Sequence, residues 1–442
     1  MKKVLIIANL FHASPRIPGM AKYLSDFGWE PTIITVPVAK DPRNLLGFPD
    51  DFLGKVRIIE TPYKGDIFVL WRKVFKFFGF GANKSILSQT KKKFGITSQK
   101  SFIDFIFNLY LTIFGYPDGE KKWFKPAFKV ASKLLEKENF DAIISSFSPA
   151  TAHLIANKLK NKYKQNSFAK GKKIPWVAEF RDLWTQNDNY SFPWWRKIFE
   201  TRLELNTLST ADVLITVSHP LSEKLKKFYK KEKIYVITNG FDPEKVNEPS
   251  LELTKKFTIT YTGQIYFQKR DPLKIIVALK DLIAEKIIDP NDIDLRFFGS
   301  ESFFLHKEIE KYKLSSVVKE YDKIPREEVL KKQRESQILL LLKWEDPKEK
   351  GVYSGKIFEY LAAKRPILAT GGSKDVISEL LEETKAGIDA LTVEEIKIAL
   401  KSFYYEYKQK RKVSFNGDIE EINKYSYREV AKKFADVLNQ TI

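Results

Sequence analysis

Short apolar runs alternate with longer amphipathic stretches along the first half of the chain. Six runs have the length and composition of buried strands: Val4–Ala8, Pro31–Val36, Val56–Glu60, Ala142–Ser146, Trp176–Glu179 and Val213–Val217. Helical spacing follows several of them, at Pro18–Phe27, Ala150–Lys162 and Pro220–Lys230. Strands that alternate with helices predict right-handed βαβ units and therefore a parallel sheet.

The same pattern starts again after the polar link Asp242–Lys256. Five more strands are predicted, at Thr258–Tyr261, Asp294–Phe298, Val317–Glu320, Ile338–Leu342 and Pro366–Thr370. The helices between them are expected near 272–286, 304–313, 325–335 and 354–363. We therefore expect an α/β protein with two doubly wound, Rossmann-like domains, 1–245 and 246–425, that face a cleft, followed by an amphipathic helix within 426–442. Ligands of such sheets bind outside the C-terminal strand ends, which here border the cleft.

The segment Val352–Gly372 carries the most specific chemistry. It is predicted to form a turn, a helix that opens at Ser354 and Gly355, and a buried strand. A helix start with unpaired N–H groups and Lys356 beside it can bind an anion. Glu359, about one turn later, can accept hydrogen bonds from a diol, so the pair suggests a nucleotide. An ordinary surface helix with a Lys–Glu ion pair fits the same residues.

Residues 351–369, GVYSGKIFEYLAAKRPILA, resemble the donor-site motif of the family 4 glycosyltransferases, which have the GT-B fold, and more closely the branch that builds bacterial surface polysaccharides. Further segments agree with this family in the same order: FGWEPTIITV (27–36), PWVAEFRDLWT (175–185), ADVLITVSHPLSEKL (211–225), VITNGFDPE (236–244) and YTGQIYFQKRDP (261–272). The resemblance implies a retaining transferase whose N-terminal domain holds the acceptor and whose C-terminal domain holds a UDP- or GDP-linked sugar.

The resemblance also implies a donor site. The diphosphate is expected at Ser354 and Gly355, and Glu359 at the ribose. Arg270, Lys356 and Asp182 are the implied catalytic residues, and the remaining donor-site candidates follow strand ends: Gly263, Gln264, Lys269, Gly299 and Ile324. Two positions depart from the family. Gln264 stands where the family has Arg. The family also has two Glu residues eight positions apart: Glu359 matches the second, and Gly351 stands at the first, which contacts the donor sugar.

Acceptor binding is expected on the N-terminal domain, at His12, Arg16, His153, Arg181 and Trp184. Two of these have structural alternatives. Arg181 and Asp182 can form a simple ion pair, and a lone His such as His153 is commonly a core residue. No spacing of His, Asp or Glu predicts a metal site, so we expect metal-independent catalysis without a cofactor.

Charge is concentrated in the first half of the chain. The net charge is +20; residues 1–245 carry 41 basic and 23 acidic residues, and 246–442 carry 35 and 33. The window 66–133 alone has 13 basic and 4 acidic residues and 12 of the 34 Phe residues. We interpret it as an insertion that docks on an anionic membrane near a glycan or lipid-linked acceptor. A helix pair buried against the domain is the alternative.

Composition restricts the remaining possibilities. The chain has no Cys, which excludes disulfides and thiolate metal sites. No apolar stretch is long enough to span a bilayer, so we expect a cytoplasmic protein held peripherally at the inner face of the cell membrane. Two alternative functions stay open: a UDP-sugar 2-epimerase of the same fold, and a non-catalytic basic binder of nucleic acid or another anionic polymer. No nucleic-acid motif is present, and we expect no nucleic-acid partner.

Overall fold

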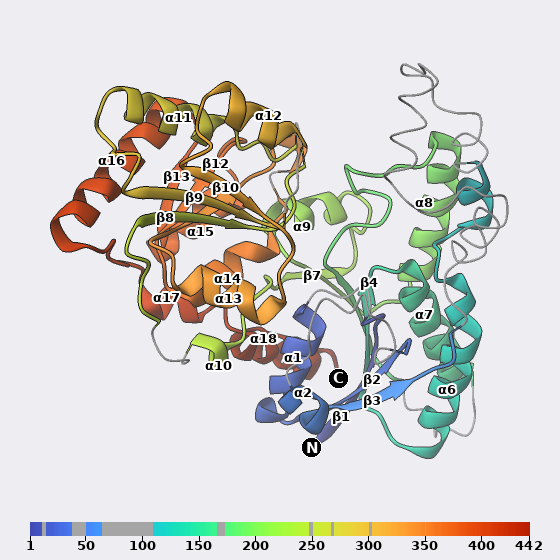
Figure 1. Ribbon diagram of the computed structural model, residues 1–442. Coiled ribbons are helices and arrows are strands. Elements are labelled where there is room, and N and C mark those ends of the chain that lie inside the picture. The colour runs from blue at the N-terminus through green and yellow to red at the C-terminus, as the bar shows by residue number, and fades with distance from the viewer. Residues whose placement is uncertain are drawn as a thin grey trace.

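The computed structural model describes residues 1–10, 15–37, 50–63, 109–165, 173–246, 251–266, 269–299, 303–349 and 351–442. The chain forms two lobes, each built on a parallel sheet with helices on both faces (Figure 1). The two doubly wound domains predicted from the hydrophobic pattern are confirmed.

The first sheet has the strand order β3-β2-β1-β4-β5-β6-β7. Its elements are β1 (Lys2–Ile7), α1 (Arg16–Leu24), β2 (Trp29–Thr35), α2 (Asp50–Lys55), β3 (Arg57–Glu60), α6 (Phe124–Lys137), β4 (Ala142–Phe147), α7 (Ala150–Gln165), β5 (Trp176–Phe180), α8 (Trp194–Leu208), β6 (Val213–Thr216), α9 (His219–Lys226), β7 (Lys233–Val236) and α10 (Pro243–Val246). The order reverses beside β1, and such a switch point is where doubly wound sheets open a binding crevice.

The second sheet has the order β10-β9-β8-β11-β12-β13. Its elements are β8 (Phe257–Thr262), α11 (Leu273–Ala284), β9 (Ile293–Phe298), α12 (Phe303–Lys311), β10 (Val318–Tyr321), α13 (Arg326–Arg334), β11 (Ile338–Leu342), α14 (Gly355–Ala363), β12 (Ile367–Thr370), α15 (Val376–Thr384), β13 (Gly387–Ala390), α16 (Val393–Lys410), α17 (Ile419–Asn423) and α18 (Tyr427–Thr441). Here the order reverses between β8 and β11, and the segments that follow β8, β9, β10 and β11 carry the donor-site candidates.

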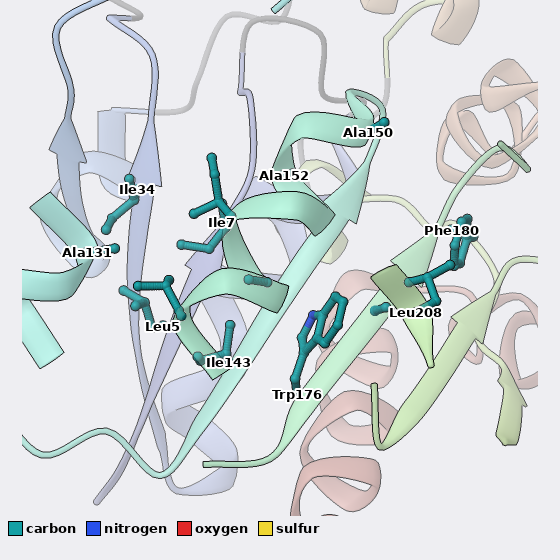
Figure 2. Close-up of a cluster of buried hydrophobic side chains, with 14 of the residues drawn as sticks. Leu5, Ile7, Ile34, Ala131, Ile143, Ala150, Ala152, Trp176, Phe180 and Leu208 are labelled. Carbon is teal, nitrogen blue, oxygen red and sulfur yellow. The ribbon is translucent and has the colours of Figure 1, made fainter. Parts of the chain in front are cut away.

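Each sheet is covered on both faces, so a central strand such as β11 is buried at every residue and not at alternate ones. On one face of the first sheet, Leu5 and Ile7 of β1 and Trp176 of β5 pack against α6 and α7 (Figure 2). On the other face, Val4 and Ile6 pack in a cluster that α1 and α18 complete. These two clusters hold the strand ends of the first domain in fixed positions.

The last helix, α18, belongs spatially to the first domain. Val430, Phe434 and Leu438 are buried in the cluster that contains Val4 and Ile6. The chain crosses between the domains twice, and the two crossings are hydrogen-bonded where Tyr427 N donates to Phe241 O at 2.7 Å. The Tyr427 ring lies so close to α1 that a Cβ at Gly19 would overlap it.

Two strands were not predicted from the sequence, and both lie at sheet edges. β7 has the sequence KIYV and β13 the sequence GIDA, and neither is a continuous buried run. An edge strand has one unpaired side and can form with little apolar surface, as these two do; the other two edge strands, β3 and β10, were predicted.

The window 66–133 falls largely outside the described residues, including its Lys91–Lys93 cluster. Its described part contains a helical stretch at 109–114 and the first half of α6. Among the helices that the structure describes, none combines the length and the apolar composition that crossing a bilayer requires.

Candidate functional site

Gly263, at the end of β8, leaves room for the Lys356 side chain, and Gly299, at the end of β9, lies next to Gly263. Gly263 has φ +125° and Gly299 has φ +86°, both in the region that side chains other than Gly rarely adopt. A Cβ at Gly263 would overlap the Lys356 side chain, and a Cβ at Gly299 would lie 3.8 Å from Gly263 Cα. The Lys356 side chain therefore packs directly against the backbone of Gly263.

The helix that carries Lys356 begins without a side-chain cap. Ser354 is the N-cap of α14 and is buried, but its hydroxyl accepts no bond from the first turn. Gly355 is exposed and leaves the helix end open. The first turn thus presents backbone N–H groups and the positive end of the helix dipole beside the Lys356 ammonium.

A second cation stands next to Lys356. The Arg270 guanidinium carbon lies 4.4 Å from the centroid of the Trp344 ring. Lys356 Nζ donates to Tyr261 Oη at 3.2 Å. Burial, and next the charge of Arg270, lower the pKa of Lys356 from 10.5 to about 8. Among the described residues, no carboxylate lies within ion-pair distance of either cation, and the charge of Glu359 only partly offsets the lowering of the Lys356 pKa. Two adjacent cations at an open helix start can bind an anion.

Glu359 lies one turn further along α14. Its carboxylate accepts from Arg326 Nη2 at 2.9 Å and from Gln333 Nε2 at 3.3 Å. Both partners come from α13, and Gln333 also donates to Thr262 Oγ1 at 3.0 Å. Because each carboxylate oxygen has two lone pairs, these contacts orient Glu359 and leave it able to accept from a diol.

The other donor-site candidates lie around this centre. Gln264 Oε1 accepts from Tyr266 Oη at 2.8 Å. Lys269 is exposed, with its Nζ 5.8 Å from the Trp344 ring centroid. Ile324 is half-buried in the loop between β10 and α13. Just before it, the Tyr321 ring stacks on Phe298 with centroids 4.6 Å apart, and so offers an aromatic face near the strand ends.

Sequence reasoning missed Tyr261, Trp344 and Arg326. Each acts on a predicted residue: Tyr261 and Trp344 support the two cations, and Arg326 holds Glu359. Tyr261 lies near the end of β8, Trp344 follows β11 and Arg326 starts α13, so nothing local distinguished them from ordinary residues at element ends.

On the acceptor side, His153 is completely buried. Its Nδ1 is 2.7 Å from Ser145 Oγ, and Phe147 and Phe180 pack against the ring. Burial lowers the pKa of His153 to about 3, so the imidazole is neutral at physiological pH. The structure therefore supports the alternative of a core histidine and not direct contact with an acceptor.

Arg16 is also buried, with 1% of its surface exposed. Its Nε donates to Glu179 Oε1 at 2.7 Å, and its Nη2 donates to Ile237 O at 2.7 Å. Ser146 Oγ donates to the other oxygen of Glu179. The guanidinium thus joins α1, β5 and the loop after β7, which is a structural role within the first domain.

Trp184 is buried as well, and its Nε1 donates to Glu200 Oε2 at 3.3 Å. Arg181 and Asp182 form an ion pair at 3.0 Å with both side chains partly exposed. These two residues follow β5 and are thus the predicted acceptor-side residues that solvent reaches among those described. His12 lies outside the described residues.

Two polar contacts bring the loop before α14 against the first domain. Ser218 Oγ donates to Gly351 O at 2.7 Å, and the Asn189 amide donates to Glu349 Oε1. A Cβ at Gly351 would lie 2.9 Å from Pro220 Cβ. A side chain at position 351 would therefore collide with Pro220, which accounts for Gly at the position where family 4 glycosyltransferases have Glu.

Within the described parts of the chain, no group of three His, Asp or Glu side chains is arranged to hold a metal ion. Arg270, Lys356 and the start of α14 bring positive charge together at this site.

Residues 107–245 match the family model for Glycosyltransferase Family 4. No curated protein matches the chain significantly. The fold is shared with HepE of Anabaena, solved with UDP and glucose, at a TM-score of 0.60 and 12% identity over 100% of both chains. A glycosyltransferase from Rickettsia africae ESF-5 gives a TM-score of 0.57 and 16% identity, over 100% of this chain and 98% of that one.

A putative UDP-N-acetylglucosamine 2-epimerase from Listeria monocytogenes also shares the fold, with a TM-score of 0.54 and 10% identity over 100% of this chain and 96% of that one. At these identities the structural likeness establishes the fold and nothing finer. The fold and the family match together confirm the resemblance to family 4 glycosyltransferases with the GT-B fold.

Proposed function

We propose that this chain, a glycosyltransferase of the GT-B fold, transfers a sugar with retention from a UDP- or GDP-linked donor to a glycan or lipid-linked acceptor of a surface polysaccharide. One observation carries the donor half of the proposal. Lys356 and Arg270 lie together at an open helix start, without a carboxylate partner among the described residues, and Glu359 lies one turn away.

The proposed chemistry depends on charge and position. Arg270, Lys356 and the α14 N-terminus would stabilise the negative charge that develops on the leaving diphosphate. Retention would follow if the leaving phosphate takes the proton of an acceptor hydroxyl that approaches from the same face. Such a step needs a well-placed acceptor more than an enzymic base, which fits the buried, neutral state of His153.

Asp182 is proposed to help place the acceptor. It is paired with Arg181, follows β5 and keeps part of its surface in solvent. We also propose that the reaction is metal-independent, with the two cations in place of Mg²⁺. Activity that EDTA abolishes and Mg²⁺ or Mn²⁺ restores would contradict this.

The decisive experiment is a panel of nucleotides and nucleotide sugars, read by protection against thermal unfolding and by product analysis. We expect UDP or GDP, with its matching sugar, to raise the Tm of the wild type and not that of Arg270→Met/Lys356→Met. Release of the nucleotide with transfer of the sugar supports the proposal. Interconversion of the sugar at C2 without an acceptor would identify an epimerase instead, and RNA binding without nucleotide-sugar binding would identify a basic binder.

A further inference from the structure

Helix α8 has an inverted amphipathic pattern: it buries charged side chains and exposes aromatic ones. Its buried side contains Arg196, Glu200 and Glu204, whereas its first two turns expose Trp194, Trp195, Ile198 and Phe199. Trp194 is 75% exposed and Phe199 is 55% exposed. A helix of a water-facing domain normally buries its aromatic residues and exposes its carboxylates, so this inversion marks a surface with a partner.

The inverted orientation is well supported from within. Glu200 accepts from Arg196 and from Trp184, and Glu204 accepts from the Thr185 backbone at 3.0 Å and from Tyr229 at 3.1 Å. The carboxylates cannot turn outward without losing these bonds. The outward position of the tryptophans therefore belongs to the folded structure.

A second helical stretch extends the same surface. Arg196 donates to the carbonyls of Leu111, Thr112, Gly115 and Pro117, at distances from 2.8 to 3.2 Å. These bonds fix the end of helix 109–114 against α8. Leu109, Ile113 and Phe114 on that helix are exposed. We call the combined surface the aromatic ridge: Leu109, Ile113, Phe114, Trp194, Trp195, Ile198 and Phe199.

The charged residues around the ridge indicate the chemical class of its partner. The exposed charged residues of α8 are Lys197 and Arg202, both cations, while its carboxylates are inside. Just beyond the second helix, Asp118 and Glu120 are turned inward, and Lys122 and Lys125 are exposed. Tryptophan and aliphatic groups beside cations, with the acids removed from the surface, fit the interface of an anionic bilayer.

The ridge follows an interdomain contact in the sequence. Asn189, in the segment between β5 and α8, contacts Glu349 of the second domain, and α8 begins five residues later at Trp194. Docking through the ridge would bring the acceptor side of the cleft to the lipid surface.

We propose that the aromatic ridge inserts into the interface of an anionic membrane and presents the cleft to a membrane-bound acceptor. The acceptor clause rests on the proposed function, but the docking itself does not. The ridge shares Leu109, Ile113 and Phe114 with the basic window that the sequence suggested, and its other four residues lie on α8, outside that window.

The test is co-sedimentation of the full chain with vesicles of phosphatidylglycerol and phosphatidylcholine, and of phosphatidylcholine alone. We expect wild type to bind the anionic vesicles at least tenfold more tightly than Trp194→Ser/Phe199→Ser does. The matched control is Ile398→Ser/Tyr405→Ser, which removes two exposed apolar side chains from α16 of the second domain and should bind as wild type does.

Insertion has its own readout. Brominated phospholipids should quench wild-type tryptophan fluorescence, and Trp194→Phe/Trp195→Phe should bind the same vesicles with most of that quenching lost. The Tm of the ridge variant with and without UDP separates docking from folding and from donor binding. The proposal is overturned if wild type does not bind, if the ridge variant binds equally well, or if the ridge variant instead dissociates a dimer of the wild type.

Discussion

The predicted donor side and the predicted acceptor side differ in whether their cations are paired with a carboxylate. In the C-terminal domain, Arg270 and Lys356 lie side by side, and burial together with the charge of Arg270 lowers the pKa of Lys356. In the N-terminal domain, Arg16 is neutralised by Glu179 and sealed in the core. A cation that has no ion-pair partner is available to bind an anion, whereas a buried cation with its hydrogen bonds satisfied stabilises the fold.

The comparison predicts first that Arg16 matters for stability and not for acceptor binding. Arg16→Leu should lower the free energy of unfolding by about 3–5 kcal/mol, because it leaves the Glu179 carboxylate buried without its partner. Urea denaturation measures this. Arg16→Leu/Glu179→Leu should recover much of the loss. If Arg16→Leu unfolds like wild type but has a raised KM for the acceptor, the structural assignment of Arg16 is wrong.

The donor side should respond in the opposite way. Arg270→Met should lower kcat by about 10²–10³-fold, as removal of one preorganised donor to a developing oxyanion does. Its urea midpoint should stay close to that of wild type, since no described carboxylate depends on it. Steady-state kinetics with the donor found in the panel provide the measurement. Lys280→Met, at an exposed cation of α11 that has no assigned role in the site, is the control and should keep most of the activity.

Glu359 tests the diol part of the site. Glu359→Ala should weaken UDP or GDP binding by about 1.5–3 kcal/mol, the range for a hydrogen bond to a charged group. Titration calorimetry with the nucleotide and with its 2′,3′-dideoxy form sharpens the test. Wild type should prefer the form with the diol, and Glu359→Ala should not.

Arg326→Met is the matched control for Glu359, because it removes the partner of the carboxylate and not the carboxylate itself. It should keep the preference for the diol. Loss of that preference in Arg326→Met alone would assign ribose binding to Arg326.

His153 predicts a pH dependence of stability on the acceptor side. The pKa of His153 is about 3 in the folded chain, against 6.5 for an ordinary His. Below pH 6.5 the unfolded chain therefore binds a proton at this residue that the folded chain does not bind. Stability therefore falls as the pH decreases below 6.5. Between pH 7 and pH 5 wild type should lose about 2 kcal/mol more than His153→Phe does, measured by urea unfolding at both values. Equal losses would place the imidazole in solvent.

Lys356 predicts a smaller pH dependence on the donor side. Its ammonium loses its proton as the pH rises through about 8, and a bound diphosphate favours the charged form. Nucleotide affinity should therefore fall above pH 8, by at most about tenfold per pH unit. Lys356→Arg should bind with the same affinity from pH 7 to pH 9.5. An unchanged wild-type affinity over this range would remove Lys356 from the diphosphate site.

The two domains were predictable from the chain alone because a buried parallel strand is apolar on both faces. Runs such as Ile338–Leu342 and Val213–Val217 therefore stand out from their surroundings. The α14 start was equally visible, since Ser354, Gly355, Lys356 and Glu359 lie within six residues. The hydrophobic pattern is weaker in short edge strands: it predicted β3 and β10 but missed β7 and β13.

Local sequence fixes what a residue can do, and the fold decides whether it is free to do it. Lys356 and Arg270 are 86 positions apart in number, and only the return of α14 to the end of β8 brings their charges together. The same kind of long-range packing buries His153 and Arg16, which looked available from their own neighbours. It also turns Trp194 outward by giving the carboxylates of α8 partners in the interior, because a buried charge must be paired and an exposed ring need not be.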